Sequence, residues 1–262
     1  MGNDSIKKVL IVSFSLCIFC SVLVSGAAIV LKEKQQQNKV MDVKRNLLIS
    51  SGVIDSSVTD KNEILKAYES VTELAVDLSS GDVLSDYDVA SLDTRKMAKT
   101  PGQNISLTSG QDLAKIKNIS KVSKVYLVKN SSNKVEKIVL PVHGKGLWST
   151  LYGFLALAPD TKTIKGLGFY EHGETPGLGG EVDNPRWKKI WVNKIALNDK
   201  YAPQMVIVKG QVDHSLKSSA NKVDGLSGAT ITSNGVQALV NFWVGQNGYG
   251  PFLEKYRQGE VL

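Results

Sequence analysis

The segment DGLSGATITS, residues 224–233, places small residues and hydroxyls directly before an apolar stretch that is long enough for a helix. The amides and the positive dipole end at the start of a helix attract anions, so we expect this segment to bind a phosphate. It is neither a Walker motif nor a nucleophile elbow, because no Gly-Lys-Ser/Thr follows and only Ser227-Gly228 of Gly-x-Ser-x-Gly is present. The simpler alternative is a helix cap at Thr232 or Ser233 after a flexible lead-in.

Thr230 carries the hydroxyl at the end of the SGAT run. A threonine that acts as a hydrolytic nucleophile needs a free N-terminal amine or a neighbouring base. The sequence places neither beside Thr230. We therefore interpret Thr230 as a residue that is chemically modified rather than as a catalytic group.

The second candidate is the loop FYEHGETPGLGGEVDNPRW, residues 169–187, which is rich in glycine and proline. A loop this constrained is more often a binding element than a spacer. Glycines let the backbone approach a ligand closely, so their amides can reach the carbonyls and nitrogens of a flat cofactor ring. The glycines concerned are Gly173, Gly177, Gly179 and Gly180.

Glu171, His172 and Glu174 of this loop suggest two other chemistries. A zinc site needs three or four convergent ligands, and the glycines and prolines preclude the helix that would place these side chains on one face. We therefore expect no metal ion. Glu171 and Glu174 could instead form a carboxylate pair for hydrolysis, but the sequence supplies no substrate for it.

The third candidate is LPVHGKGLWSTLYG, residues 140–153, in which two glycines flank Lys145. The glycines allow a close backbone approach to a ligand. His143, Lys145 and Trp148 would then offer a hydrogen-bond donor, a positive charge and a flat surface. The alternative is a glycine-rich turn between strands, with Trp148 in the core.

An apolar stretch of 23 uncharged residues, 9–31, precedes these segments. At about 1.5 Å per residue, a helix of this length crosses a hydrocarbon core of roughly 30 Å. It exceeds the ~7–15 residues of a signal-peptide core, so we expect an uncleaved anchor. Both flanks carry two lysines, which leaves the orientation open. Cys17 and Cys20, the only cysteines, lie inside the stretch, so the rest of the chain has no disulfide or thiol nucleophile.

The remaining pattern predicts an α+β fold, a mostly antiparallel sheet with packed helices, preceded by one N-terminal transmembrane helix. Helices are expected over residues 32–52 and 61–70, after a cap at Asp183 or Asn184, and through VQALVNFWV. Loops are expected over residues 79–110. The β-rich runs are residues 124–130, 135–142, 151–158, 163–171 and 204–210.

The net charge of +7 does not indicate nucleic-acid binding. The lysines are spread through the chain rather than clustered with aromatic residues or set in a binding motif. We interpret them as a solvated surface that anionic membrane lipid would attract.

The run from Asp224 to Thr230 resembles the flavinylation motif Asp-x-x-Ser/Thr-Gly-Ala-Thr, whose last threonine carries FMN through a phosphoester bond. HGETPGLGGE, following HGKGLW at the distance seen here, resembles the rest of the same FMN-binding domain. Together with the single anchor and the LYGFLALAPD stretch, these motifs are most similar to the C subunits of sodium-translocating NADH:quinone oxidoreductases. The resemblance covers the anchor and roughly residues 124–257.

This resemblance implies a subunit, not catalytic alone, of a membrane respiratory complex that oxidises NADH, reduces ubiquinone and pumps sodium. FMN on Thr230 would relay single electrons between a membrane-embedded iron centre and the FMN of a neighbouring B subunit, in a complex with A, D, E and F subunits. A separate flavin transferase, using FAD and magnesium, would attach the cofactor. The protein would be a single-pass protein of the bacterial inner membrane with a periplasmic domain.

The expected parts are a cytoplasmic N-terminus (1–8), the anchor (9–31), a membrane-proximal helix and loop region (32–120) and the FMN-binding domain (121–262). Amides and hydroxyls near Thr175 and Leu178 would bond the ring edge, and Lys145 would favour anionic reduced flavin. The expected cofactor-binding residues are Thr230, Ser227, Gly228, Ala229, Asp224, Thr232, Glu174, Thr175, Gly177, Leu178, Gly179, His143, Lys145 and Trp148.

Three rival functions are compatible with the same motifs. The homologous G subunit of Rnf-type complexes shares them and would be distinguished by its neighbouring genes. A membrane-tethered flavin sensor predicts that loss of the protein leaves NADH oxidation and sodium pumping intact. A hydrolase predicts turnover without a bound chromophore.

Overall fold

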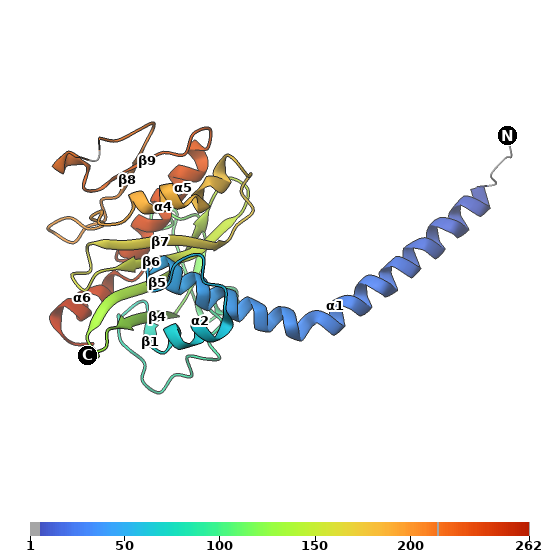
Figure 1. Ribbon diagram of the computed structural model, residues 1–262, viewed down its shortest axis with the longest axis horizontal. Coiled ribbons are helices and arrows are strands. Elements are labelled where there is room, and N and C mark those ends of the chain that lie inside the picture. The colour runs from blue at the N-terminus through green and yellow to red at the C-terminus, as the bar shows by residue number, and fades with distance from the viewer. Residues whose placement is uncertain (1–5, 214, 262) are drawn as a thin grey trace. The chain divides into compact units, whose positions relative to one another are not determined.

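The computed structural model describes residues 6–213 and 215–261 and contains two compact units, Met1–Val43 and Lys44–Leu262. The first helix, α1, runs from Ile6 to Ser50 (Figure 1). Its apolar residues between 9 and 31 are exposed, which fits a membrane anchor. The predicted end of this helix at Gly52 is confirmed, because Gly52 adopts a left-handed φ of 64° just after it.

The second unit is built on a five-stranded antiparallel sheet in the order β1-β4-β5-β6-β7. Together with the packed helices, this sheet confirms the α+β class. Four of its strands were predicted, whereas β1 was not. The strands are β1 (Val71–Asp77), β4 (Val122–Lys129), β5 (Val135–Lys145), β6 (Thr150–Leu157) and β7 (Ile164–Glu171).

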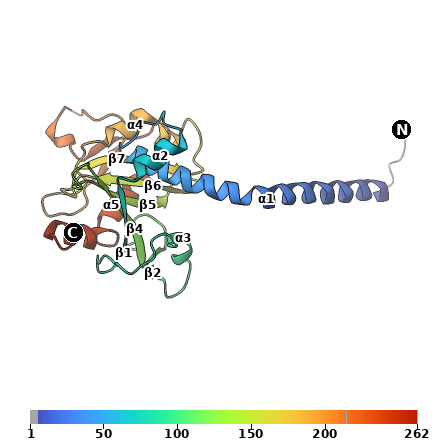
Figure 2. The same cartoon turned by 60° about the horizontal axis from the view of Figure 1, so that its bottom comes forward.

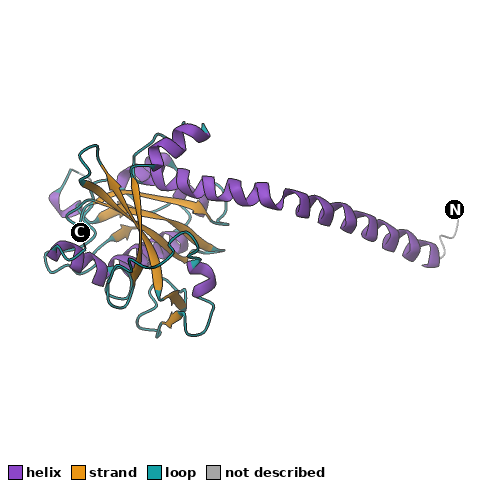
Figure 3. Ribbon diagram, turned by 90° about the horizontal axis from the view of Figure 1, so that it is seen from below, coloured by secondary structure: helices purple, strands orange, loops and turns teal. Residues whose placement is uncertain are grey.

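Both faces of the sheet are covered, as Figure 3 shows. Helix α5 (Thr230–Val244) packs on one face, where the Cβ that Gly144 lacks would lie 2.8 Å from the Cβ of Leu239. The last turn of α1 packs on the other face, where Ser50 lies against Gly166 and Gly168 of β7. The strand register agrees, because side chains alternate between the two faces.

Shorter elements complete the unit. Figure 2 shows α3 and β2 beside β1 and β4, so the region expected to be loops also contains two short elements. The elements are α2 (Lys61–Tyr68), α3 (Thr94–Met97), β2 (Asn104–Ser106), β3 (Asn118–Ser120), η1 (Gly179–Asp183), α4 (Pro185–Ile190), β8 (Val206–Val208), η2 (Lys217–Ser219), β9 (Lys222–Asp224) and α6 (Gly250–Gln258).

The helix α4 confirms one local prediction in detail. Asn184 is its N-cap and accepts a hydrogen bond from the Arg186 amide, and Pro185 occupies the first turn. Proline suits that position because the amide it lacks would have had no acceptor within the helix. This start places Trp187 where its Nε1 donates to the carbonyl of Asp224, in the segment that leads to Thr230.

The sheet also draws on the part of the chain before residue 121. β1 pairs along its whole length with β4, from Val71 opposite Val128 to Asp77 opposite Val122. The segment 71–77 is therefore an edge strand of the same sheet. The division into four parts at residues 8, 31 and 120 stays a prediction.

Candidate functional site

Helix α5 begins at Thr230, earlier than the sequence indicated. Ala229 is its N-cap and makes no side-chain capping bond, so the prediction of a cap at Thr232 or Ser233 is wrong. The small residues explain the early start, since Gly228 adopts a left-handed φ of 70° that turns the chain directly into the helix. The amides of the first turn of α5 are therefore not satisfied by a capping side chain.

Thr232 and Ser233 have other partners inside the first turn. The hydroxyl of Ser233 accepts a hydrogen bond of 3.0 Å from the Leu226 amide. The hydroxyl of Thr232 donates one of 2.6 Å to Glu174 Oε2. Both side chains are buried, and they fix the lead-in segment and the glycine-rich loop against the start of α5.

Glu174 joins all three of the segments that the sequence singled out. Besides the Thr232 hydroxyl, its carboxylate accepts the backbone amides of Leu147, Trp148 and Ser149 at 3.1, 3.0 and 3.1 Å. Only 5% of the residue is exposed. A buried carboxylate needs such a full set of donors, and here the donors come from the turn after β5 and from α5.

The charge of Glu174 follows from these contacts. Burial by itself would raise the pKa of this carboxyl group, but the hydrogen bonds from Thr232, Ser149, Trp148 and Leu147 lower its pKa below the ordinary value. Glu174 is therefore ionised at neutral pH and acts only as a hydrogen-bond acceptor. We call the contact of Glu174 with the turn after β5 and the first turn of α5 the Glu174 junction.

Two glycines are required at this junction because the backbones approach closely. A Cβ on Gly146 would lie 2.6 Å from Glu174 Oε1, and a Cβ on Gly179 would lie 2.6 Å from the Thr232 hydroxyl. Real Cβ atoms do not approach other atoms so closely. The absence of a side chain at Gly146 and Gly179 therefore leaves room for the Glu174 side chain and its hydrogen bond to Thr232.

Glu171, His172 and Glu174 do not share a ligand site. Glu171 forms two hydrogen bonds of 2.9 Å with Arg95. His172 accepts from the Glu174 amide through Nδ1 at 3.2 Å, so its Nε2 donates to Asp183 at 2.8 Å. Within residues 6–213 and 215–261, no group of three His, Cys, Asp or Glu side chains could hold a metal ion. The two glutamates are held by different partners, which gives no support to a carboxylate pair.

His143 lies apart from this junction, in an aromatic stack. Its ring lies 5.5 Å from the Tyr152 ring and 4.9 Å from the Trp243 ring, measured between centroids. Burial, with a contribution from the positive charge of Arg95, lowers the pKa of His143 to about 4. His143 is therefore neutral at pH 7, and it lies half-buried between two aromatic rings.

Trp148 and Lys145 lie at the surface. Trp148 is 67% exposed, so the alternative that placed it in the core is wrong. Lys145 is exposed, and its Nζ donates to the carbonyl of Trp148 at 3.3 Å. This contact places a positive charge beside the backbone of Trp148, whose indole is exposed.

Four exposed apolar side chains surround the start of α5, and we call them the apolar rim. Leu178 lies against Gly228, where an added Cβ would approach its Cδ2 to 2.9 Å. The amide of Trp148 donates a hydrogen bond to Glu174, and Glu174 also accepts one from Thr232, the residue after Ile231. Exposed apolar side chains gathered in this way indicate a binding surface. The apolar rim consists of Leu147, Trp148, Leu178 and Ile231.

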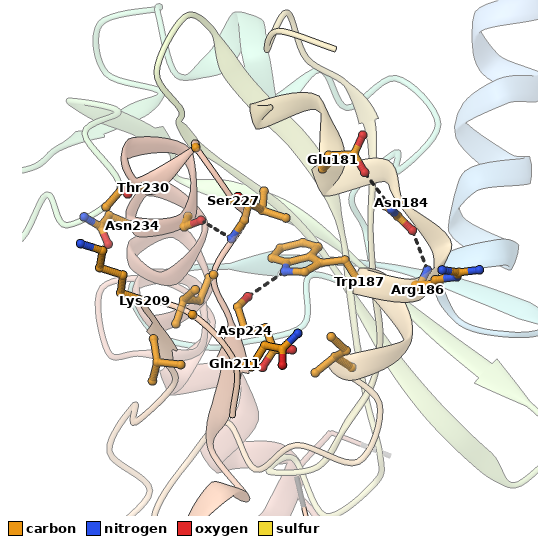
Figure 4. A pocket seen from close by; sticks show the side chains of 18 of the residues that line it. Glu181, Asn184, Arg186, Trp187, Lys209, Gln211, Asp224, Ser227, Thr230 and Asn234 are labelled. Carbon is orange, nitrogen blue, oxygen red and sulfur yellow. Dashed lines mark hydrogen bonds between the residues drawn. The ribbon is translucent and has the colours of Figure 1, made fainter. Parts of the chain in front are cut away.

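A cavity of ≈ 730 Å³ lies beside Thr230, between α4 and α5 (Figure 4). Trp187 closes one side of it and donates from Nε1 to the carbonyl of Asp224 at 2.9 Å. The carboxylate of Asp224 accepts the Val212 amide at 2.8 Å. Asp224, the last residue of β9, is thus bonded both to Trp187 of α4 and to Val212. Other lining residues are Gly177, Ser227, Gly228, Arg186 and Lys209.

The structure thus divides the predicted site residues into two neighbouring groups. Asp224, Ser227, Gly228, Thr230 and Gly177 line the cavity. The others, His143 excepted, lie at the Glu174 junction or on the loops that it joins: Glu174, Thr175, Leu178, Gly179, Lys145, Trp148, Ala229 and Thr232.

Sequence reasoning missed three of the residues that line the cavity. Arg186 and Trp187 follow the predicted cap of α4, and Lys209 lies within the predicted run 204–210, directly after β8. Their local patterns identify a helix start and a strand end but not a shared cavity. The only earlier signal was the position of Arg186 and Trp187 at the end of the glycine-rich loop.

Comparisons with known proteins agree on one family. The family model of the FMN-binding domain matches residues 146–245. Proteins named as the C subunit of Na(+)-translocating NADH-quinone reductase are 43% identical in Yersinia pestis, over 99% of this chain and 96% of theirs, and 46% identical in Vibrio vulnificus, over 98% of both chains. The Pseudomonas aeruginosa protein of that name is 43% identical over 99% of both chains.

Two solved structures are similar in fold. The crystal structure of Shewanella oneidensis NqrC superposes with a TM-score of 0.76 at 35% identity and covers 86% of this chain and 99% of its own. The crystal structure of the corresponding Na(+)-translocating NADH-quinone reductase protein of Parabacteroides distasonis has a TM-score of 0.64 at 26% identity, covering 85% and 96%.

Proposed function

Since the chain belongs to the family of Na(+)-translocating NADH-quinone reductase C subunits, we propose that it carries electrons through FMN bound covalently to Thr230. Membership makes it a subunit of an oxidoreductase complex, with an FMN-binding domain at residues 146–245. The covalent bond, its position and the electron partners are parts of the proposal.

The observation that carries the proposal is the position of Thr230. It is the first residue of α5, its side chain is exposed, and it lines the cavity. The amides of the first turn face the same region and are not capped by Ala229. A phosphate on the Thr230 hydroxyl would receive hydrogen bonds from these amides and favourable interaction with the helix dipole.

The surroundings fit the rest of the cofactor. The apolar rim offers an exposed indole and two leucines for a flat, largely apolar ring. Thr175 and the glycines of the loop would bring backbone groups to the edge of this ring, and Lys145 would place a positive charge near it. The bound flavin would supply one-electron transfer, and the residues of this chain would orient the ring and set its electrostatic surroundings.

The role of the chain in the complex follows from the resemblance. We propose that it relays electrons between a membrane-embedded iron centre and the FMN of a B subunit, on the path from NADH to ubiquinone that drives sodium transport. The domain would be periplasmic, with α1 anchoring it in the inner membrane. A covalent bond would prevent loss of the cofactor from this domain, because free FMN is not maintained in the periplasm.

The test is the intact mass of the protein purified from cells that contain the flavin transferase. Wild type should carry one FMN mass on the peptide containing Thr230, and it should fluoresce under ultraviolet light in a denaturing gel. Thr230→Val should lose both signals. Thr59→Val, the control, alters an exposed threonine outside the three site segments and should keep the covalent mass. Unchanged flavin content in Thr230→Val would refute the covalent site.

A further inference from the structure

The apolar rim accounts for the ring of a resting flavin, but the cavity beside Thr230 carries a second feature. Two cations, Arg186 and Lys209, line its walls and are exposed. Within the parts of the chain that the structure describes, neither has an acidic side chain within ion-pair distance. Exposed cations that face a cavity without acidic partners suit a ligand with several negative charges.

The two cations belong to opposite walls. Lys209 follows β8, which is bonded to α5 through the Ile207 amide and the side-chain oxygen of Gln237 at 2.7 Å. Arg186 belongs to α4, across the cavity. Figure 4 shows Thr230 and Lys209 on one side and Arg186 on the other. Thr230 therefore has one cation on its own wall and one on the opposite wall, beyond Trp187.

The acidic residues of the cavity are already engaged by hydrogen-bond donors. Glu181 accepts from the Asn184 amide group at 2.7 Å, and Asp224 accepts the Val212 amide. The positive charge of Lys194 also acts on Asp224 and offsets part of the repulsion that this carboxylate exerts on an incoming anion. The cavity volume of ≈ 730 Å³ also lies within the ~300–1,000 Å³ of small-molecule sites.

This arrangement matches the geometry of transfer at phosphorus. The attacking and leaving oxygens lie roughly in line on opposite sides of the phosphorus atom. Cations that contact the transferred and the leaving phosphates stabilise the charge that develops there. An acceptor hydroxyl on one wall with a cation on the opposite wall provides that disposition.

We propose that this cavity receives the diphosphate of a flavin dinucleotide while Thr230 is modified, with Lys209 contacting the phosphate that is transferred and Arg186 the phosphate that leaves. The inference rests on the proposed covalent attachment of FMN to Thr230. It assigns part of the donor site to the acceptor protein rather than to the transferase alone.

The step is a substitution without change of oxidation state. The Thr230 hydroxyl oxygen forms a bond to the flavin-side phosphorus of FAD. The anhydride bond between the two phosphates breaks, and its electron pair stays on the oxygen of the departing AMP. A base of the transferase takes the hydroxyl proton, and magnesium held by that enzyme shares the charge of the diphosphate.

The test measures initial rates of flavin incorporation into the flavin-free full-length chain, with purified transferase, magnesium and varied FAD. Arg186→Gln and Lys209→Gln should each raise the KM for FAD or lower kcat by about tenfold, whereas Lys209→Arg should retain most of the rate. The control Lys189→Gln removes a charge from the same helix α4, outside the cavity lining, and should change the rate less than about twofold.

Two outcomes would overturn the inference. Rates of both Gln variants within twofold of wild type would show that the cations do not contact the donor. A higher KM for the acceptor protein with an unchanged KM for FAD would show that they dock the transferase instead. Failure of the proposed function is distinct, because wild type would then take up no flavin or Thr230→Val would take up as much as wild type.

Discussion

The hydroxyl of Thr232 donates a 2.6 Å hydrogen bond to Glu174, and this contact joins the helix that starts at Thr230 to the glycine-rich loop. The same carboxylate holds the turn that carries Trp148. The three segments that resemble a flavin site are therefore connected by one buried side chain, and the integrity of the site can be tested at that residue.

Glu174→Gln should destabilise the domain by about 2 kcal/mol, because the new amide group would point hydrogens at amide or hydroxyl donors and leave a buried donor unpaired. Urea denaturation measures this loss. The control Glu136→Gln alters an exposed glutamate of β5 and should stay within about 0.5 kcal/mol. Equal stability of the two variants would show that Glu174 does not hold the junction.

Gly146→Ala should also destabilise the domain, by about 1–3 kcal/mol, because its Cβ would lie 2.6 Å from Glu174 Oε1 and force the turn away. Gly173→Ala is the matched control, since its Cβ would meet only an ordinary contact of 3.4 Å with Ser149. Thermal denaturation compares the two. A Gly146→Ala protein as stable as Gly173→Ala would contradict the close approach seen here.

His143 should make folding depend on pH between 6.5 and about 4. The unfolded chain binds a proton at the ordinary pKa of 6.5, whereas burial lowers the pKa of His143 in the folded state to about 4. The unfolded state binds more protons in this window, so stability falls as pH falls through it. The unfolding free energy of His143→Phe should fall less steeply over this window, and parallel curves for the two proteins would refute the shift.

Asp224 should act through its acceptor oxygen rather than as a base. Asp224→Asn can still accept the Val212 amide and should take up flavin within about twofold of the wild-type rate, whereas Asp224→Ala should be about tenfold slower. Either variant removes a negative charge that acts on Lys194, so unfolding free energies are measured alongside. An Asn variant as slow as the Ala variant would favour a role for the charge itself.

Trp148→Ala should change the flavin and not the fold. The residue is exposed, so the unfolding free energy should shift by no more than about 0.5 kcal/mol. If the ring packs on the indole, its removal should raise the fluorescence of the attached flavin while the covalent mass persists. Tyr87→Ala, which removes an exposed ring elsewhere, should leave that fluorescence unchanged.

Local patterns predicted most of the fold because each element carries its own signal. Asn184 and Pro185 mark the start of α4, and β-rich runs mark four strands of the sheet. Strand β1 was missed because the run at Val71 contains glutamate and aspartate and becomes a strand only by pairing with β4. Helix α6 was overlooked although Pro251 in its first turn and Gly259 after its end are ordinary helix signals.

The candidate site was less predictable, because its geometry depends on contacts between distant segments. The motifs predicted Thr230 and Glu174 as site residues, but sequence alone did not show that Thr232 points at Glu174 rather than capping the helix. Nor did it show that Arg186 and Thr230 line opposite sides of one cavity. Such relationships arise from packing of the sheet and cannot be expressed as a local period or spacing.

The wide separation of the donors to Glu174 bears on the order of events during biosynthesis. Trp148 is 26 residues away along the chain and Thr232 is 58 residues away. Closing loops of these lengths costs entropy that only the assembled sheet can repay. The Thr230 hydroxyl is thus presented in its final geometry only after folding, so the proposed flavin attachment would act on the folded domain rather than on the nascent chain.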